Sequence, residues 1–300
     1  MALGDVRTFH SRDFPLGRLH DAKGGRFVSV CIPARDEEAT IGPIVASLCS
    51  ELLDRAELVD EVLVVDDGSL DATATVAADA GATVLAAADV LPGCGPGTGK
   101  GEALWKALGA AKGEVLAFCD ADLREFDPQF VVGVLGPLLV DDSVDFVKGF
   151  YRRPLDGVVG EGGRVTELVA RPVLNLLFPH LSTVAQPLAG EFAARRSVLE
   201  HVPFVRGYGV DLALLVDVAA RSGVDAVAQV DLGTRTHRNR SLHELGPQAV
   251  AVLATALRRA GMSVAEDGRV VLRRPGLEPV FVDIAERPPI ATVAAYRERS

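Results

Sequence analysis

The first half of the chain alternates short apolar runs with segments in which apolar residues recur every three or four positions. The runs at 27–33 and 61–66 predict strands, and the segment at 37–53 between them predicts a helix. The residues that share one face of this helix are Ile41, Ile44, Val45, Leu48 and Leu52. The same alternation predicts more elements further on, namely helices at 72–80, 101–111 and 128–139 and strands at 82–86, 115–119 and 144–149. Strands that are apolar throughout are buried on both faces, so the pattern predicts an α/β fold with a mostly parallel sheet and helices on both faces.

This alternation ends near residue 153. The later pattern predicts helices at 164–177, 211–221 and 242–260 and strands at 225–231 and 269–274. We expect an N-terminal arm at 1–26, ordered or not, a first half at 27–153 and a second half at 154–300. No Gly/Ser/Pro-rich linker separates the halves, which predicts one integrated domain. The tail at 288–300 is expected to form a last helix, a dimer arm or a frayed end.

Composition and charge narrow the class of protein. The 300 residues are 48% hydrophobic, and 31 basic against 41 acidic residues give a net charge of −10. A negative chain is poorly suited to bind nucleic acid or an anionic membrane surface. No apolar run is long enough to span a bilayer and no signal-peptide layout is present, so we expect a cytoplasmic protein without a membrane partner. The four cysteines lack metal-ligand spacing, and Cys31 and Cys119 fall in apolar runs, where cysteine usually packs as a small hydrophobe.

Carboxylates gather where three of the predicted strands end. Asp120-Ala121-Asp122 follows the strand at 115–119, and two carboxylates at this spacing can reach a divalent cation and a ribose hydroxyl together. The alternative for this Asp-x-Asp sequence is an acidic turn that caps the next helix. Glu37 follows the first strand and Asp66-Asp67 the second. Parallel strands bring these ends to one edge of the sheet, which favours a nucleotide with its metal as the ligand.

A glycine-rich segment at 93–101 lies before the helix at 101–111. It does not match the P-loop pattern, because residue 94 is cysteine and the residue after Lys100 is glycine. Such a loop can instead close over a nucleotide-sugar and place the Lys100 ammonium near a phosphate or base. The alternative is a surface linker with a solvated lysine.

The second half contains further candidates for binding. Gly163, Arg164 and Thr166 open a predicted helix, and free N–H groups, a guanidinium and a hydroxyl together suit a phosphate or carboxylate. His237 is a candidate metal ligand, although a single histidine is more often structural. Asp211 is either the cap of its helix or a carboxylate that faces a sugar.

Eight motifs occur in an order that resembles a known family. They are P-A-x-x-E-E at 33–38, V-D-D-G-S at 65–69, G-K-G-E-A-L at 99–104, D-A-D at 120–122, G-G-R-V-T-E at 162–167, Q-P-L-A-G-E at 186–191, G-Y-G-V-D at 207–211 and T-H-R-N-R at 236–240. The resemblance, from about residue 27 to 260, is to the glucosyl-3-phosphoglycerate synthases, which are retaining glycosyltransferases of the Rossmann-like GT-A fold. The mannosyl-3-phosphoglycerate synthases are close kin. The first three motifs are shared by many family-2-like glycosyltransferases, whereas G-G-R-V-T-E together with T-H-R-N-R is far more specific.

The resemblance implies transfer of glucose from an NDP-glucose, most simply UDP-glucose, to 3-phosphoglycerate with Mg²⁺ or Mn²⁺, in a homodimer. Carried over by position, it implies nucleotide-sugar binding by Pro33, Ala34, Glu37, Asp67, Lys100, Asp120 and Ala121, acceptor binding by Gly163, Arg164, Thr166 and Asn239, metal binding by Asp122 and His237, and catalytic roles for Asp211, the Leu188 carbonyl and Lys100. The family usually has Glu at the position of Asp211 and commonly Ser at that of Asp67. Transfer of mannose from GDP-mannose, a lipid-phosphate glycosyltransferase and a nucleotide-binding domain without catalysis are the alternatives.

Overall fold

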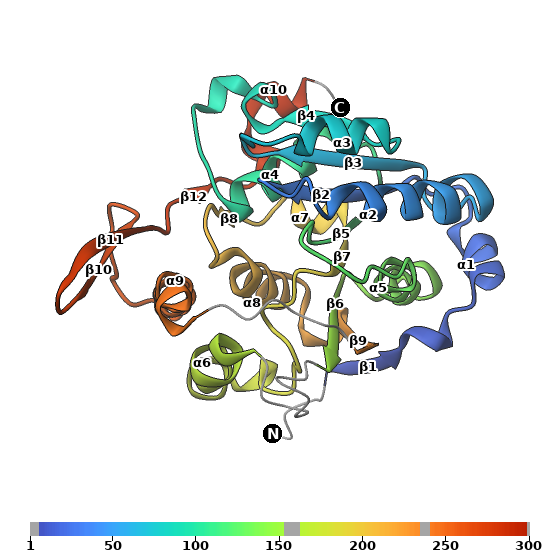
Figure 1. The fold of residues 1–300 in the computed structure, drawn as a ribbon. Coiled ribbons are helices and arrows are strands. Elements are labelled where there is room, and N and C mark those ends of the chain that lie inside the picture. Colours follow the sequence, from blue (N-terminus) through green and yellow to red (C-terminus); the bar gives the residue numbers. More distant parts are fainter. Residues whose placement is uncertain (1–5, 153–162, 235–240, 299–300) are drawn as a thin grey trace.

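The structure is a computed structural model that describes residues 6–152, 163–234 and 241–298. Eight strands form one sheet in the order β1-β9-β6-β7-β5-β2-β3-β4 (Figure 1). Their bounds are β1 Arg7–His10, β2 Val28–Ala34, β3 Glu61–Asp66, β4 Thr83–Ala86, β5 Val115–Phe118, β6 Phe146–Arg152, β7 Phe192–Arg195 and β9 Val227–Thr234. All neighbouring pairs are parallel except those that β7 makes with β5 and β6. The predicted mostly parallel α/β sheet is therefore confirmed.

Helices cover both faces of this sheet, as the apolar strands predict. One face packs against α1 Leu16–Lys23, α2 Ile41–Leu48, α3 Thr73–Asp79 and α5 Gln129–Val140. The other packs against α4 Lys100–Ala110, α6 Arg171–Leu177 and α8 Val210–Ser222, with α9 Leu242–Arg259 on the outside of α8. Consecutive residues of a strand face opposite sides of the sheet. Val30 and Ile32 pack on the side of α2 and α5, whereas Cys31 packs on the side of α4 and α8. This alternation explains why both faces of each strand are apolar.

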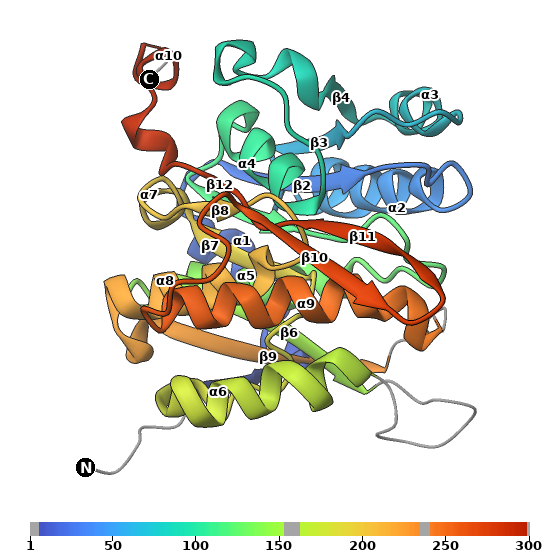
Figure 2. The same ribbon diagram turned by 90° about the vertical axis from the view of Figure 1, so that its left-hand side faces the viewer.

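Smaller elements complete the second half of the chain. β8 Phe204–Val205 pairs with β12 Glu286–Arg287, and the hairpin of β10 Arg269–Arg274 and β11 Leu277–Asp283 extends away from the sheet (Figure 1). Figure 2 shows this hairpin lying along α9. The short helices α7 Arg196–Leu199 and α10 Ala294–Arg297 are joined by a hydrogen bond from Arg196 Nη1 to the Tyr296 hydroxyl at 2.8 Å. Within the described residues, no helix has both the length and the apolar character needed to cross a membrane.

Most of the predicted elements agree with the structure to within a few residues. The predicted helix at 37–53 begins at Ile41 and continues after α2 as a π-helical segment, Cys49–Arg55. The segment at 1–26 contributes β1, which pairs in parallel with β9, and the tail contributes α10. The pattern did not predict β7, because Phe192–Arg195 contains two alanines and no β-branched residue and so has little strand character. Because β7 and β9 join the same sheet as β2, the two halves share one sheet.

Candidate active site

The carboxyl ends of β2, β3 and β5 lie side by side at one edge of the sheet. Ala34 at the end of β2 pairs in register with Asp66 at the end of β3, and Cys31 pairs with Phe118 at the end of β5. The Asp67 N–H continues this pairing by donating to the Ala34 carbonyl at 2.9 Å. The structure thus brings the sequence-predicted residues Pro33, Ala34, Asp67, Asp120 and Ala121 to a common edge.

The Asp67 carboxylate connects this edge to the glycine-rich loop. Asp67 Oδ2 accepts a hydrogen bond from the Gly99 N–H at 2.8 Å and lies 3.8 Å from Arg35 Nη1. Burial raises the pKa of Asp67 above its ordinary value, while the Gly99 N–H and the Arg35 guanidinium act in the opposite direction. Gly99 has a φ of +106°, a conformation that favours glycine, so the turn before α4 depends on this residue.

Glu37 lies in the loop between β2 and α2. Its N–H donates to Thr73 Oγ1 at 2.7 Å, and its side chain accepts from Thr40 Oγ1 at 3.2 Å. These bonds attach the loop to the start of α3 and hold it next to the end of β2.

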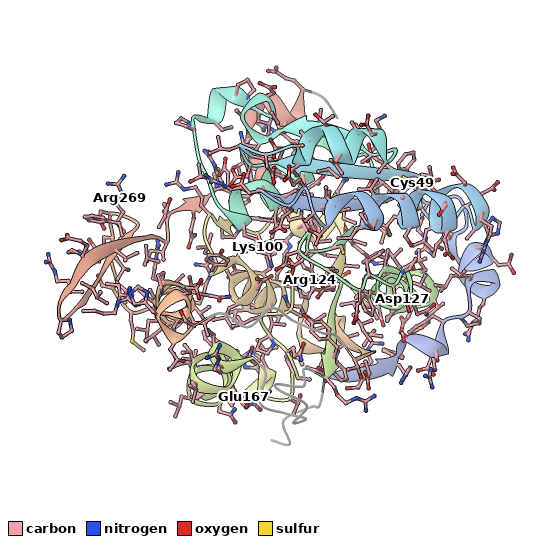
Figure 3. All side chains as sticks on the ribbon, in the orientation of Figure 1. Cys49, Lys100, Arg124, Asp127, Glu167 and Arg269 are labelled. Carbon is pink, nitrogen blue, oxygen red and sulfur yellow. The ribbon has the colours of Figure 1, made fainter. Side chains whose placement is uncertain are left out.

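Lys100, the first residue of α4, joins two carboxylates that are far apart in the sequence. Its Nζ lies 3.1 Å from Asp120 Oδ1 and 3.0 Å from Asp211 Oδ2. Figure 3 shows Lys100 in the middle of the molecule, between α4 and α8. Burial opposes the charge of Lys100, but the two carboxylates outweigh it and raise the pKa of Lys100 above its ordinary value. The ammonium is therefore charged at neutral pH and sets the distance between the end of β5 and the start of α8.

Asp120 itself is packed tightly against the chain that leads into β7. A Cβ added to Gly190 would lie 2.1 Å from Asp120 Oδ2 and 2.2 Å from its Oδ1. A side chain at this position would force the Asp120 carboxylate out of its present place beside Lys100. The G of the Q-P-L-A-G-E motif therefore has a steric explanation.

A second lysine, which the sequence argument missed, lies on the other side of Asp211. The Lys148 side chain on β6 is 1% exposed, and its Nζ donates to the Ala189 carbonyl at 2.7 Å and lies 3.6 Å from Asp211 Oδ1. Burial lowers the pKa of Lys148 to about 8, although the Asp211 carboxylate raises it. The sequence feature that could have identified Lys148 is its place in the predicted buried strand at 144–149, where lysine is rare.

Leu188 lies in the turn that leads from α6 towards β7 and is half-buried. The Gln186 side chain holds the start of this turn, because its Oε1 accepts from the Tyr151 N–H at 3.4 Å and its Nε2 donates to the Tyr151 carbonyl. The next residue, Ala189, carries the carbonyl that Lys148 binds. The Leu188 backbone is thus held from β6 on both sides.

The three described candidates for the acceptor lie within one helical turn. Gly163 has a φ of +80°, and its carbonyl accepts from the Glu167 N–H at 3.0 Å. Arg164 begins the helical stretch that runs through Thr166 into α6, and Thr166 is buried. The other acceptor candidate, Asn239, and the metal candidate His237 lie outside the described residues.

The carboxylate oxygens at the end of β5 suit a hard divalent cation as ligands. Asp122 is exposed and Asp120 half-buried, so two carboxylates lie near the surface where the strand ends. Mg²⁺ and Mn²⁺ take such oxygen ligands and usually complete their coordination with phosphate oxygens and water. Over 6–152, 163–234 and 241–298, no three Asp, Glu, His or Cys side chains form a metal cluster. The two carboxylates suit an ion that takes its remaining ligands from a phosphorylated molecule.

Arg287 on β12 holds the glycine-rich loop in place and was not predicted. Its Nε and Nη2 donate to the Glu102 carboxylate at 2.6 and 2.7 Å, and its guanidinium also donates to the carbonyls of Cys94 and Gly95 at 2.5 and 2.8 Å. Because these bonds anchor the loop and Lys100 bridges two carboxylates, the interpretation of 93–101 as a surface linker with a solvated lysine is wrong.

Comparisons with known proteins agree on one family. The family model described as glycosyl transferase family 2 matches residues 29–164. The glucosyl-3-phosphoglycerate synthase of Mycolicibacterium smegmatis is 47% identical over 297 residues, covering 95% of this chain and 97% of that protein. That of Petrotoga mobilis is 39% identical, covering 98% and 96%.

Solved structures extend the match to three dimensions. The glucosyl-3-phosphoglycerate synthase of Mycobacterium tuberculosis in complex with Mn²⁺, UDP-glucose and phosphoglyceric acid superposes with a TM-score of 0.87 at 43% identity, covering 95% of this chain and 98% of that one. A structure of the same enzyme with Mn²⁺, UDP and glucosyl-3-phosphoglycerate superposes with a TM-score of 0.83 at 42% identity, with the same coverage. With relatives this similar over nearly its whole length, the chain belongs to the glucosyl-3-phosphoglycerate synthase family of GT-A glycosyltransferases.

Proposed function

We propose that this protein transfers glucose from UDP-glucose to the hydroxyl group of 3-phosphoglycerate, with retention at the sugar carbon and with a divalent cation. The observation that carries the proposal is the bridge from Lys100 to Asp120 and Asp211, which joins the carboxylate-rich strand ends to the second half of the chain. The relatives' complexes with UDP-glucose, phosphoglyceric acid and the glucosylated product support the choice of substrates.

On the donor side, we assign the uridine to the ends of β2 and β3. Pro33, Ala34 and Glu37 would hold the base and Asp67 would lie beside the nucleoside, at the edge where β2 and β3 pair in register. Asp120 and Ala121 would contact the ribose. Lys100 would contact the nucleotide, and its charge suits a diphosphate.

We assign the metal to Asp122 and His237, with phosphate oxygens as the remaining ligands. The bound ion would neutralise the charge that develops on the departing diphosphate. Removal of the cation is therefore expected to abolish transfer.

The acceptor would bind at the start of the helical stretch before α6. The free N–H groups there, the Arg164 guanidinium and the Thr166 hydroxyl suit an anion, and Asn239 would add a further hydrogen bond. An anion site built from local groups explains how a chain with a net charge of −10 can bind two anionic substrates.

At the sugar, Asp211 and the Leu188 carbonyl would accept hydrogen bonds from glucose hydroxyls. In the proposed step, the bond from the sugar C1 to the β-phosphate oxygen breaks and the acceptor oxygen bonds to C1 on the same face. The acceptor proton passes to the departing phosphate oxygen. No side chain then needs to act as a covalent nucleophile.

Three further expectations stay predictions from the sequence. They are the boundaries at 26 and 153, a homodimer and a cytoplasmic location. Size-exclusion chromatography with light scattering tests the dimer directly.

The experiment for the function measures UDP release from UDP-glucose and Mg²⁺, with and without 3-phosphoglycerate. Acceptor-dependent release together with a glucosylated product supports the proposal, whereas no release with UDP-, GDP- or ADP-glucose contradicts it. Asp122→Ala is expected to fold normally and to lose transfer. Full activity of this variant would exclude Asp122 as a metal ligand.

A further inference from the structure

The central lysine of an apolar strand has no role in the function proposed so far. Lys148 lies on β6 with its Nζ 6.0 Å from the centre of the Phe146 ring and 5.2 Å from that of Phe192. Transfer of an ammonium group out of water is costly unless hydrogen-bond acceptors and opposite charges replace the water. The partners of Lys148 therefore indicate what this residue does.

The Lys148 ammonium joins two segments that are separate in the fold. It donates to the Ala189 carbonyl at 2.7 Å, in the turn before β7, and lies 3.6 Å from Asp211 Oδ1, in the first turn of α8. The Ala189 N–H in turn donates to the Gln186 carbonyl at 3.1 Å, which closes the turn around Leu188. A change at Lys148 would remove one of the contacts that hold each of these two segments.

The two oxygens of Asp211 are used differently. Oδ2 accepts from Lys100 at 3.0 Å, whereas Oδ1 is buried and has no hydrogen-bond partner within the part of the chain that the structure describes. A buried carboxylate oxygen without a hydrogen bond is unfavourable, and a donor from a ligand would satisfy it. The two lysines thus hold the carboxylate from both sides while Oδ1 retains the capacity to accept.

We propose that Lys148 is a positioning residue for the donor sugar, because it holds the Leu188–Ala189 backbone and the Asp211 carboxylate in the arrangement that receives hexose hydroxyl groups. The inference rests on the proposed function, in which Asp211 and the Leu188 carbonyl face the glucose. Lys148 acts through these two groups and does not touch the reacting atoms.

Charged groups face Lys148 from each element packed around it. They are Lys100 of α4, Asp120 after β5, Glu191 before β7 and Asp211 of α8. Burial lowers the pKa of Lys148 to about 8, whereas the carboxylates around Lys100 raise the pKa of that lysine. Between pH 7 and 9.5, Lys148 thus loses its proton while Lys100 stays charged.

The test compares the affinities for UDP and for UDP-glucose, measured by calorimetry with Mg²⁺. Lys148→Met is expected to bind UDP within about twofold of wild type and to lose at least about tenfold in affinity for UDP-glucose, as for the loss of a charged hydrogen-bond donor. A merely structural role would weaken both ligands equally. Equal losses, or none, would overturn the inference.

A matched control is available at the other end of the sheet. Lys23 is also buried and donates to the Glu57 carbonyl at 2.9 Å and to Asp60 Oδ1 at 2.8 Å. Lys23→Met removes a buried lysine with the same kinds of partners but away from the candidate active site. It is expected to lower the melting temperature without changing the ratio of the two affinities.

The wild-type protein gives a second reading that does not depend on the folding of a variant. The affinity for UDP-glucose is expected to fall relative to that for UDP between pH 7 and 9.5, as Lys148 loses its proton. A ratio that stays constant over this range would contradict the inference even if Lys148→Met fails to fold.

The two proposals can fail separately. Wild-type protein that transfers glucose, with Lys148→Met retaining the wild-type ratio of the two affinities, overturns the role of Lys148 alone. Wild-type protein that binds UDP-glucose but does not glucosylate 3-phosphoglycerate overturns the proposed function, and the affinity ratio still reports on Lys148.

Discussion

Replacement of Arg287 by methionine tests how the C-terminal segment holds the glycine-rich loop. The change removes two charged hydrogen bonds to Glu102, whose side chain is 0% exposed, and two to backbone carbonyls. Loss of one partner of a buried ion pair usually costs about 3 to 5 kcal/mol, because the other charge stays buried. Lys106 Nζ remains 3.8 Å from Glu102 Oε1, so we expect the lower value, about 3 kcal/mol.

This free energy translates into a measurable shift in melting temperature. An unfolding entropy of about 2.1 cal/mol/K per residue gives roughly 1.6 °C per kcal/mol for a chain of this length, so Arg287→Met should melt about 5 °C lower. The KM for UDP-glucose should rise as well, because the loop that Arg287 holds leads directly to Lys100. Both quantities are measured on the same preparation, by thermal unfolding and by UDP release.

Two control variants distinguish the loss of stability caused by burial from the loss caused by removing any ion pair. Arg171 makes a similar two-pronged contact with Glu167, at 2.9 and 3.0 Å, and donates to the Ala185 carbonyl at 2.8 Å. The side chains of this pair are 35% and 47% exposed, so Arg171→Met should cost less, about 1 to 2 kcal/mol. The double variant Glu102→Met/Arg287→Met removes both buried charges and should melt above Arg287→Met alone. An Arg287→Met protein that melts within 1 °C of wild type would refute this reasoning.

Two further predictions concern the steric limits and the reactivity of single residues. Gly190→Ala should lower transfer at least about tenfold, because its Cβ would lie 2.1 Å from Asp120 Oδ2, whereas Gly17→Ala, where no atom lies within 4 Å of the added Cβ, should retain wild-type activity. Burial raises the pKa of the Cys31 thiol, so at pH 8 a thiol reagent should label the half-buried Cys94 first and reach Cys31 only after denaturation. Labelling of native Cys31 at the rate of Cys94, or full activity of Gly190→Ala, would contradict the corresponding prediction.

Local pattern was sufficient for most of the elements that build the site. Apolar runs such as 61–66 identified the strands, and the Asp-x-Asp of 120–122 fell where β5 ends, because a buried strand must end where polar residues begin. The pattern did not predict β7, which is short and lies antiparallel between β5 and β6. Pairing of that kind depends on contacts distant in the sequence, and no local period records it.

The sequence by itself determined the fold class, the edge of the sheet that carries the carboxylates and, through its ordered motifs, the family. Those properties follow from hydrophobic period and from residue types at fixed spacing, both of which are local. Only the tertiary structure decided that Asp211 lies between Lys100 and Lys148 and that Arg287 reaches the glycine-rich loop. These contacts join residues 63 to 193 positions apart, and the burial that strengthens them exists only once the two halves pack together around one sheet.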